Sequence, residues 1–202
     1  MPNNIIKYIK RFDTEEDFDE FLYSTEYEEP NLSYVNESDT LHINEPKLLK
    51  FTAEEANSTI KLTRVGSSSG FSNAVLQYST DGATWNNYNL NNVITLTNVG
   101  DFVMFKGNNT RLGYNGNNFH KFVMTGKIAA SGCISSLTSP NDPNKALVDN
   151  IYTRLFEGCA SLTTAPELPA TTLAERCYML MFWHCTSLTT APELPATNLA
   201  DS

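Results

Sequence analysis

The sequence has no long hydrophobic run. Across 202 residues, no stretch approaches the 18 or more consecutive apolar residues that cross a membrane as a helix. Near the start, Lys7, Lys10 and Arg11 interrupt the apolar residues of IIKYIKRF far short of a secretory signal core. We therefore expect no membrane insertion and no export by a signal peptide.

Motifs for catalysis and for metal binding are also missing. The three histidines, His42, His120 and His184, lie in separate segments, and there is no Gly-x-Ser-x-Gly motif, P-loop or dinucleotide fingerprint. None of the four cysteines forms a C-x-x-C pair, and the spacing of Cys177, His184 and Cys185 matches no standard zinc pattern. The sequence thus predicts no enzyme, no cofactor and no metal. It predicts buried reduced thiols, with a strained disulfide as the alternative.

Positive charge is scarce, and the negative charge is unevenly placed. The net charge is −9, and nine of the 23 acidic residues lie between Asp13 and Glu29, where there is no Lys or Arg. The remaining 14 acids balance the 14 bases, which leaves no basic patch broad enough for nucleic acid. We expect an acidic N-terminal arm ahead of a nearly neutral body that does not bind nucleic acid.

The most informative feature present is an internal repeat. The segment SLTTAPELPAT occurs at Ser161–Thr171 and again at Ser187–Thr197, 26 residues later, and 15 of 21 positions are identical between Phe156–Arg176 and Phe182–Ser202. Repeats of this length stack on one another to bury a shared core. The chain ends within a third copy, which suggests the N-terminal part of a longer polypeptide. The alternative is a short protein whose repeats lean on the preceding domain.

The repeat pattern makes specific structural predictions. Four apolar side chains should point inward: Phe156, Leu162, Leu168 and Leu173. The composition of Thr172–Phe182 predicts a short helix, and Cys159 should lie next to Cys185 in a buried ladder. Trp183 and His184 replace Glu157 and Gly158 of the first copy, so they are candidate surface contact residues, although simple surface variation also explains the change.

The repeat residues LFEGCASLTTAPELPATTLAERCYMLMFWHCTSLTTAPELPATNLA resemble the BspA-like class of leucine-rich repeat. The resemblance covers about Tyr152–Ser202, a quarter of the chain. It implies a curved stack of short strands and loops without catalysis, as in surface proteins of gut Bacteroidetes, of some protists and of phages that infect gut bacteria.

The first 45 residues form a separate arm in the sequence. Asp13-Thr14-Glu15-Glu16 is a capping box that predicts a helix from about Thr14 to Ser24, and residues 32–43 predict a hairpin. The arm resembles N-terminal modules of fibre-type proteins in phages of gut Bacteroidetes. The resemblance implies docking on the virus particle, with four aromatic anchors: Phe12, Phe18, Phe21 and Tyr23. The alternative is an amphipathic arm folded onto its own β-domain.

Residues 46–137 alternate short apolar segments with Gly, Asn, Ser and Asp, which predicts an antiparallel β-sandwich. The expected strands are Leu48–Ala53, Thr59–Arg64, Ala74–Ser79, Val93–Thr97, Asp101–Gly107, Phe119–Thr125 and Lys127–Ala130. The expected core comprises Phe51, Ile60, Leu62, Leu76, Tyr78, Leu96, Phe102, Met104, Phe122 and Met124. Residues 108–118 should form an exposed loop. A linker at 138–151 then leads to the repeats at 152–202.

The segment Ser79–Trp85 resembles the Asp-box hairpin of sialidase propellers, but it lacks one residue and occurs once, so sialidase chemistry is not expected. An Asp-Gly turn that closes a hairpin explains the residues. The alternative is an aromatic sugar-binding surface around Trp85 and Tyr88.

The sequence as a whole predicts a mainly β chain: a short helical and hairpin arm, a β-sandwich and two BspA-like leucine-rich repeats. The resemblances favour a structural virion protein of a phage, of the crAss-like kind. It would be a homotrimeric fibre, attached to capsid or tail proteins, with head attachment preferred over tail attachment. A bacterial surface adhesin that holds a host glycan or protein is the alternative, and the absence of an export signal favours the virion.

Overall fold

The computed structural model describes residues 47–142 and 145–198, which belong to a compact unit that begins at Pro46. This part of the chain is mainly β, with one short 3-10 helix, η1 (Ile134–Leu137). None of its helices is long and apolar enough to cross a membrane. The arm at 1–45 lies outside the described residues, and so do its expected helix and hairpin and the four aromatic anchors.

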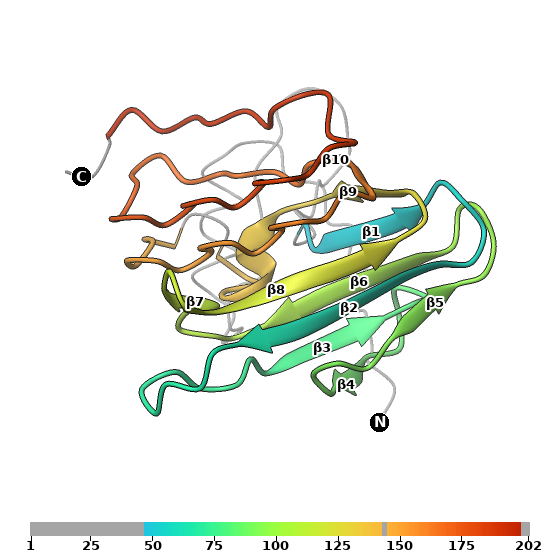
Figure 1. Ribbon diagram of the computed structural model, residues 1–202, viewed down its shortest axis with the longest axis horizontal. Coiled ribbons are helices and arrows are strands. Elements are labelled where there is room, and N and C mark those ends of the chain that lie inside the picture. Colours follow the sequence, from blue (N-terminus) through green and yellow to red (C-terminus); the bar gives the residue numbers. More distant parts are fainter. Residues whose placement is uncertain (1–46, 143–144, 199–202) are drawn as a thin grey trace, which may run out of the picture. The chain divides into compact units, whose positions relative to one another are not determined.

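Two sheets make up the β structure (Figure 1). The first contains β1 (Leu49–Ala53), β3 (Leu76–Ser79), β4 (Asn86–Tyr88), β6 (Phe102–Gly107), β9 (Ile128–Ser131) and β10 (Leu162–Thr164). Their order is β10-β9-β1-β6-β3-β4, and only the β9–β10 pair is parallel. The second contains β2 (Ser58–Val65), β5 (Ile94–Leu96), β7 (Gly113–Asn115) and β8 (Asn118–Thr125), in the antiparallel order β5-β2-β8-β7.

The two sheets share one hydrophobic core. Alternate residues of β1 and β2 are buried, which is the period-2 pattern of strands with one face on a core. The ring of Phe122 on β8 lies 4.9 Å from that of Phe51 on β1 and 5.5 Å from that of Phe105 on β6. Seven of the ten expected core residues are buried: Phe51, Ile60, Leu62, Leu76, Leu96, Phe122 and Met124.

The prediction was wrong about which face of β6 is buried. Val103 and Phe105 are fully buried, whereas Phe102 and Met104 are only partly buried on the opposite face. Four consecutive apolar residues carry no period-2 signal, so the sequence could not decide the face. On the outer face, the ammonium group of Lys50 lies 4.2 Å above the Phe102 ring. Tyr78 is also only partly buried.

The expected exposed loop at 108–118 is a second correction. Leu112 is fully buried and β7 begins at Gly113. The backbone N–H groups of both residues donate to the carbonyl oxygen of Ile151, at 2.8 and 2.9 Å. The segment is covered by residues about 40 positions later, and no local pattern in the sequence could reveal that cover.

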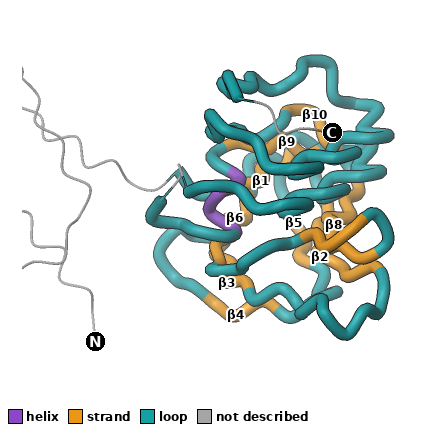
Figure 2. Tube along the Cα trace, turned by 90° about the vertical axis from the view of Figure 1, so that its left-hand side faces the viewer, coloured by secondary structure: helices purple, strands orange, loops and turns teal. Residues whose placement is uncertain are grey.

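The repeats contain turns where the sequence predicted a helix at Thr172–Phe182. Residues 175–184 form consecutive turns, and every fourth residue, Arg176, Leu180 and His184, has a positive φ of 52–59°. The first repeat has the same pattern 26 residues earlier, at Asn150, Arg154 and Gly158. An α-helix cannot accommodate such left-handed residues, although the turns reproduce its spacing of apolar positions. Figure 2 shows the resulting coils as loops beside the strands.

The repeats continue the core of the two sheets. Phe122 of β8 stacks on Phe156 at 5.5 Å, and Phe156 stacks on Phe182 at 5.5 Å with an interplanar angle of 2°. Of the expected inward residues, Phe156, Leu162 and Leu168 are buried and Leu173 packs partly buried against the core. The segment at 138–151 contributes Ile151 to the same core.

Candidate interaction surfaces

The Ser79–Trp85 segment forms a tight turn between β3 and β4, which confirms the expected hairpin. The Oδ1 atom of Asp81 accepts hydrogen bonds from the Ser79 hydroxyl at 2.8 Å, the Ala83 N–H at 2.9 Å and the Thr84 N–H at 2.7 Å. The backbone N–H donors, Thr84 first, hold the pKa of Asp81 well below its usual range. Gly82 has φ +78°, which suits glycine at this point of the turn. The turn therefore has a strong structural role.

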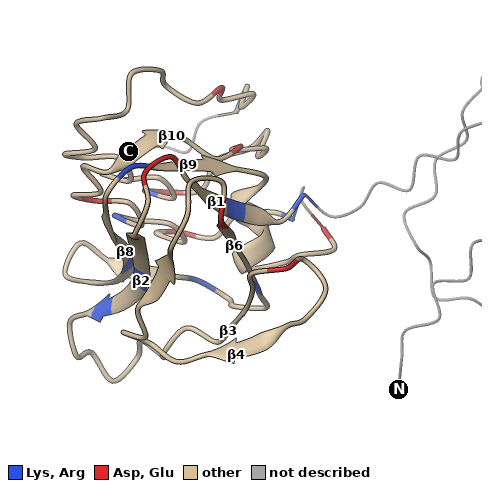
Figure 3. Ribbon diagram, turned by 90° about the vertical axis from the view of Figure 1, so that its right-hand side faces the viewer, with Lys and Arg blue, Asp and Glu red and all other residues tan. Residues whose placement is uncertain are grey.

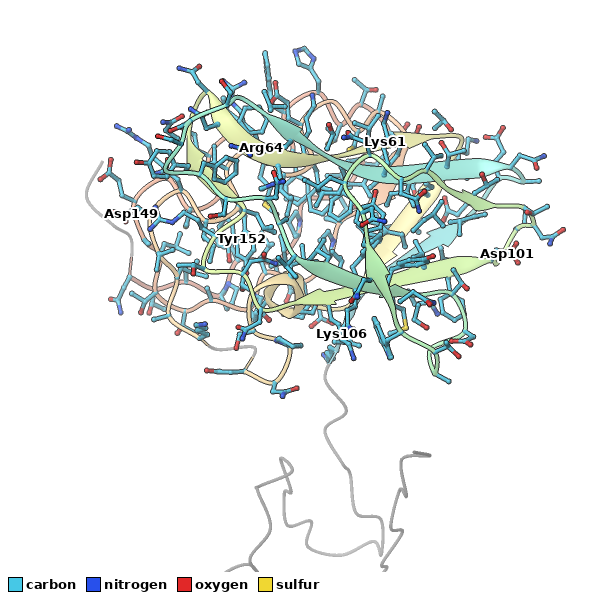
Figure 4. All side chains as sticks on the ribbon, turned by 90° about the horizontal axis from the view of Figure 1, so that it is seen from below. Lys61, Arg64, Asp101, Lys106, Asp149 and Tyr152 are labelled. Atoms are coloured by element: carbon cyan, nitrogen blue, oxygen red, sulfur yellow. The ribbon has the colours of Figure 1, made fainter. Side chains whose placement is uncertain are left out.

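Trp85 follows this turn and pairs with a cation. The ammonium group of Lys106, on β6, lies 3.9 Å from the centroid of the Trp85 ring, a cation–π contact, and burial lowers the pKa of Lys106. Figure 4 shows Lys106 at the lower edge of the described part of the chain. Sequence reasoning missed Lys106, because 21 residues separate it from Trp85 and only the β3–β6 and β3–β4 pairings bring them together.

Tyr88 is not a surface residue, which corrects the proposed aromatic surface. Its side chain is only 6% exposed, and its hydroxyl accepts a hydrogen bond from the Leu62 N–H at 2.8 Å and donates one to the Asn92 carbonyl at 2.6 Å. The β3–β4 register sets this orientation, because Tyr88 pairs with the inward-facing Leu76. A ligand at this point would meet Trp85 and Lys106 without Tyr88.

Trp183 and His184 lie together on the second repeat. Trp183 is 47% exposed, and the centroids of its ring and the His184 imidazole are 4.1 Å apart. The Arg154 guanidinium lies 5.9 Å from the Trp183 ring and 5.5 Å from the Phe119 ring, and its Nη1 is 3.1 Å from a Glu157 carboxylate oxygen. Arg154 thus links this surface to β8. Sequence reasoning missed Arg154, because its neighbours come from three separate segments.

The four cysteines are buried and unpaired, as expected for reduced thiols: Cys133, Cys159, Cys177 and Cys185. The Cys159 thiol donates to the Phe122 carbonyl at 3.2 Å and the Cys185 thiol donates to the Phe156 carbonyl at 3.0 Å, so equivalent cysteines repeat the same bond. Burial raises the pKa of both thiols. Within the residues that the structure describes, no three His, Cys, Asp or Glu side chains are grouped so that they could hold a metal ion.

The histidines do not form a site together. His42 lies outside the described residues and His184 is on the surface, but His120 on β8 is fully buried. Its Nε2 accepts the Ala74 N–H at 3.0 Å, so the Nδ1, which lies 3.1 Å from the Leu112 carbonyl, carries the proton. Burial lowers the pKa of His120 to about 4, with a smaller contribution from the charge of Arg64. This neutral imidazole fastens β8 to two loops.

A hollow of about 270 Å³ lies beside Tyr152. Figure 4 shows Tyr152 near Asp149 in the same part of the structure. The Tyr152 hydroxyl is 2.7 Å from the Thr138 hydroxyl, and the Asn109 amide bonds to Val75 and to the Leu137 carbonyl at 2.8 Å. Because these polar atoms of the lining are already engaged, the hollow offers little to orient a ligand.

Acidic and basic residues alternate over the surface of the described part of the chain, and neither sign gathers into a broad patch (Figure 3). No protein-family model matches the chain, and neither a curated protein nor a solved structure matches it. Two surfaces therefore stand out on geometry alone: the Trp85–Lys106 pair and the Trp183–His184 pair.

Proposed function

We propose that the protein is a structural component of a phage virion, a fibre that attaches by residues 1–45 and projects its repeats toward a host or another surface. The resemblance of the repeats to BspA-like leucine-rich repeats supports the repeat region as an adhesive surface. The observation that carries the proposal is the continuous packing of Phe122, Phe156 and Phe182, which joins a β-sandwich and the repeats through one core. A stalk that transmits position from an anchor to a distal contact needs such stiffness.

In this proposal the partners are capsid or tail proteins of the same virion, with head attachment preferred, and the fibre is a homotrimer. The exposed aromatic residues Trp183 and Trp85 are the contact points for a host glycan or protein, since aromatic faces bind sugars and anchor protein interfaces at low entropic cost.

Mass spectrometry of purified virions tests the proposal directly. We expect the protein at a fixed copy number per particle, and we expect a deletion of residues 1–45 to abolish its incorporation. Absence from particles, or incorporation that survives the deletion, would contradict the docking role. Light scattering of the intact protein should give a trimer mass.

Binding to host cells tests the contact residues. We expect Trp183→Ala to weaken binding, whereas Val99→Ala, which trims another exposed apolar side chain (66% exposed), should leave it unchanged. Equal binding by both variants would exclude the Trp183 surface as the contact.

A further inference from the structure

The two repeats are joined by a hydrogen-bond ladder with a single direction. Backbone N–H groups of the first repeat donate to carbonyl oxygens of the second at 2.8–3.0 Å: Asn150 to Glu175, Tyr152 to Cys177, Arg154 to Met179, Phe156 to Met181 and Gly158 to Trp183. The same direction holds where the sheet meets the first repeat. There, the N–H groups of Gly113 and Phe122 donate to the carbonyls of Ile151 and Leu155, at 2.9 and 2.8 Å.

The second repeat therefore presents a row of donors. The N–H groups equivalent to the ladder donors of the first repeat belong to Arg176, Tyr178, Leu180, Phe182 and His184. No acceptor for them occurs within 47–142 or 145–198. The carbonyls of this edge are already used. Those of residues 175, 177, 179, 181 and 183 accept from the first repeat, and those of residues 174, 176, 178, 180 and 182 accept from N–H groups three residues later.

The side chains on this edge are also uncovered. Tyr152 and Phe156 of the first repeat are 1% and 0% exposed, because Tyr178 and Phe182 stack on them at 5.9 and 5.5 Å. Tyr178 and Phe182 are themselves only partly buried, and Leu180 is 41% exposed. The edge thus combines unsatisfied donors with exposed aromatic and aliphatic surface, which is a combination that polypeptide interfaces cover.

The direction of the ladder limits what can bind. Two copies of this edge cannot pair with each other, because each would present donors to donors. The carbonyls of the first repeat that correspond to the ladder acceptors, such as Ile151 and Leu155, are occupied by β7 and β8, so they are not available to a second copy. The occupant must bring its own carbonyls at every second residue of an extended segment.

We propose that the edge formed by residues 176–184 receives one further polypeptide unit of the same 26-residue pattern, with a free row of carbonyls. Its phenylalanine stacks on Phe182, its tyrosine on Tyr178, and its cysteine donates to the Phe182 carbonyl, as Cys185 does to the Phe156 carbonyl. The proposal rests on the ladder alone and is independent of the virion function.

An extended variant tests this proposal. A second copy of residues 177–202 is appended after Ser202 to the full chain, which keeps the 26-residue phase. Hydrogen exchange is then measured at the five amides of residues 176, 178, 180, 182 and 184. We expect exchange at these amides to become at least about tenfold slower than in the unextended chain, because a buried amide exchanges only when its segment opens.

The matched control is the same extension with aspartate in place of the phenylalanine that corresponds to Phe182, which should give no protection. Slow exchange of the amides of residues 150–158 in every variant verifies that the two existing repeats remain folded. Fast exchange of the five edge amides in the extended variant, or equal protection by the aspartate control, would overturn the proposal. Protection in the unextended chain that rises with concentration would also overturn it, because it would mean that copies pair through this edge.

Discussion

Stability should fall as the pH is lowered through the titration range of His120. The imidazole is fully buried, and it is neutral with both ring nitrogens bonded. Its pKa is about 4 in the folded protein, against about 6.5 for an unperturbed histidine. Because the unfolded chain binds the proton more tightly, protonation favours unfolding, and the contribution of His120 to stability is lost as the pH falls from 6.5 toward 4.

The size of the effect follows from the two pKa values. Linkage gives a loss of roughly 2 kcal/mol in the free energy of unfolding between pH 7 and pH 5. That corresponds to a decrease of roughly 4–8 °C in the melting temperature for a domain of this size. The charged groups that also act on the ring are few. Arg64 lowers the pKa, and the bond to the Leu112 carbonyl raises it in part.

Urea unfolding at pH 7, 6 and 5, followed by circular dichroism, measures this slope. His120→Gln removes the titrating group, so the variant should be less stable at pH 7 but lose about 2 kcal/mol less than the native protein on going to pH 5. His184→Gln, which removes an exposed imidazole, is the control and should follow the native profile. Parallel profiles for the native protein and His120→Gln would refute the assignment of a buried neutral histidine.

Three other predictions concern the joint between sheet and repeats. Gly113→Ala places a Cβ against the carbonyl oxygen of Asn150 and should cost about 1–3 kcal/mol in thermal unfolding, whereas Gly116→Ala, whose nearest atom is 3.7 Å away, should be nearly neutral. Phe156→Ala should cost about 3–5 kcal/mol, and Phe182→Ala, which is half-covered, clearly less; equal costs would argue against the continuous core. The four thiols should resist a thiol reagent in the folded protein and all react in denaturant, and rapid labelling of the native protein would contradict their burial.

Local patterns predicted the strands where one face is apolar and the other is polar. The segment around Ile60 and Leu62 alternates cleanly, and it forms β2 with those residues buried. The pattern failed in β6, where Phe102, Val103, Met104 and Phe105 give both faces equal hydrophobicity. There the burial is decided by pairing with β1 and β3, which are distant in sequence.

The candidate surfaces were predictable only in part. Trp183 was found because it replaces Glu157 at the same repeat position, and the structure places it 47% exposed. Its neighbour Arg154 and the partner of Trp85, Lys106, were missed because cation–π contacts across strands and repeats leave no spacing signal. Tyr88 was misplaced for the same reason, since the β3–β4 register and not the Asp-box pattern decides its direction.

The turns of the repeats explain why the sequence suggested a helix. Each four-residue turn places one residue in the left-handed region and returns an apolar side chain to the core, so apolar positions recur at nearly the helical period. The first repeat uses Gly158 at one such position, where no atom would meet a Cβ, while the second uses His184 at φ 59°. A left-handed conformation costs a non-glycine residue about 1–2 kcal/mol, so the substitution exchanges backbone ease for an exposed imidazole beside Trp183.

Two repeats are fewer than the three or so that usually make a stable stack, and the sheet supplies what is missing. β7 and β8 provide N–H donors to the carbonyls of Ile151 and Leu155 in the first repeat, and Phe122 provides the first ring beneath Phe156. The sheet therefore acts as the neighbouring repeat on one side. The unsatisfied donors of the ladder are left on the other side, at residues 176–184 of the described chain. A ladder that runs in one direction can be completed only there, and only by a segment that accepts.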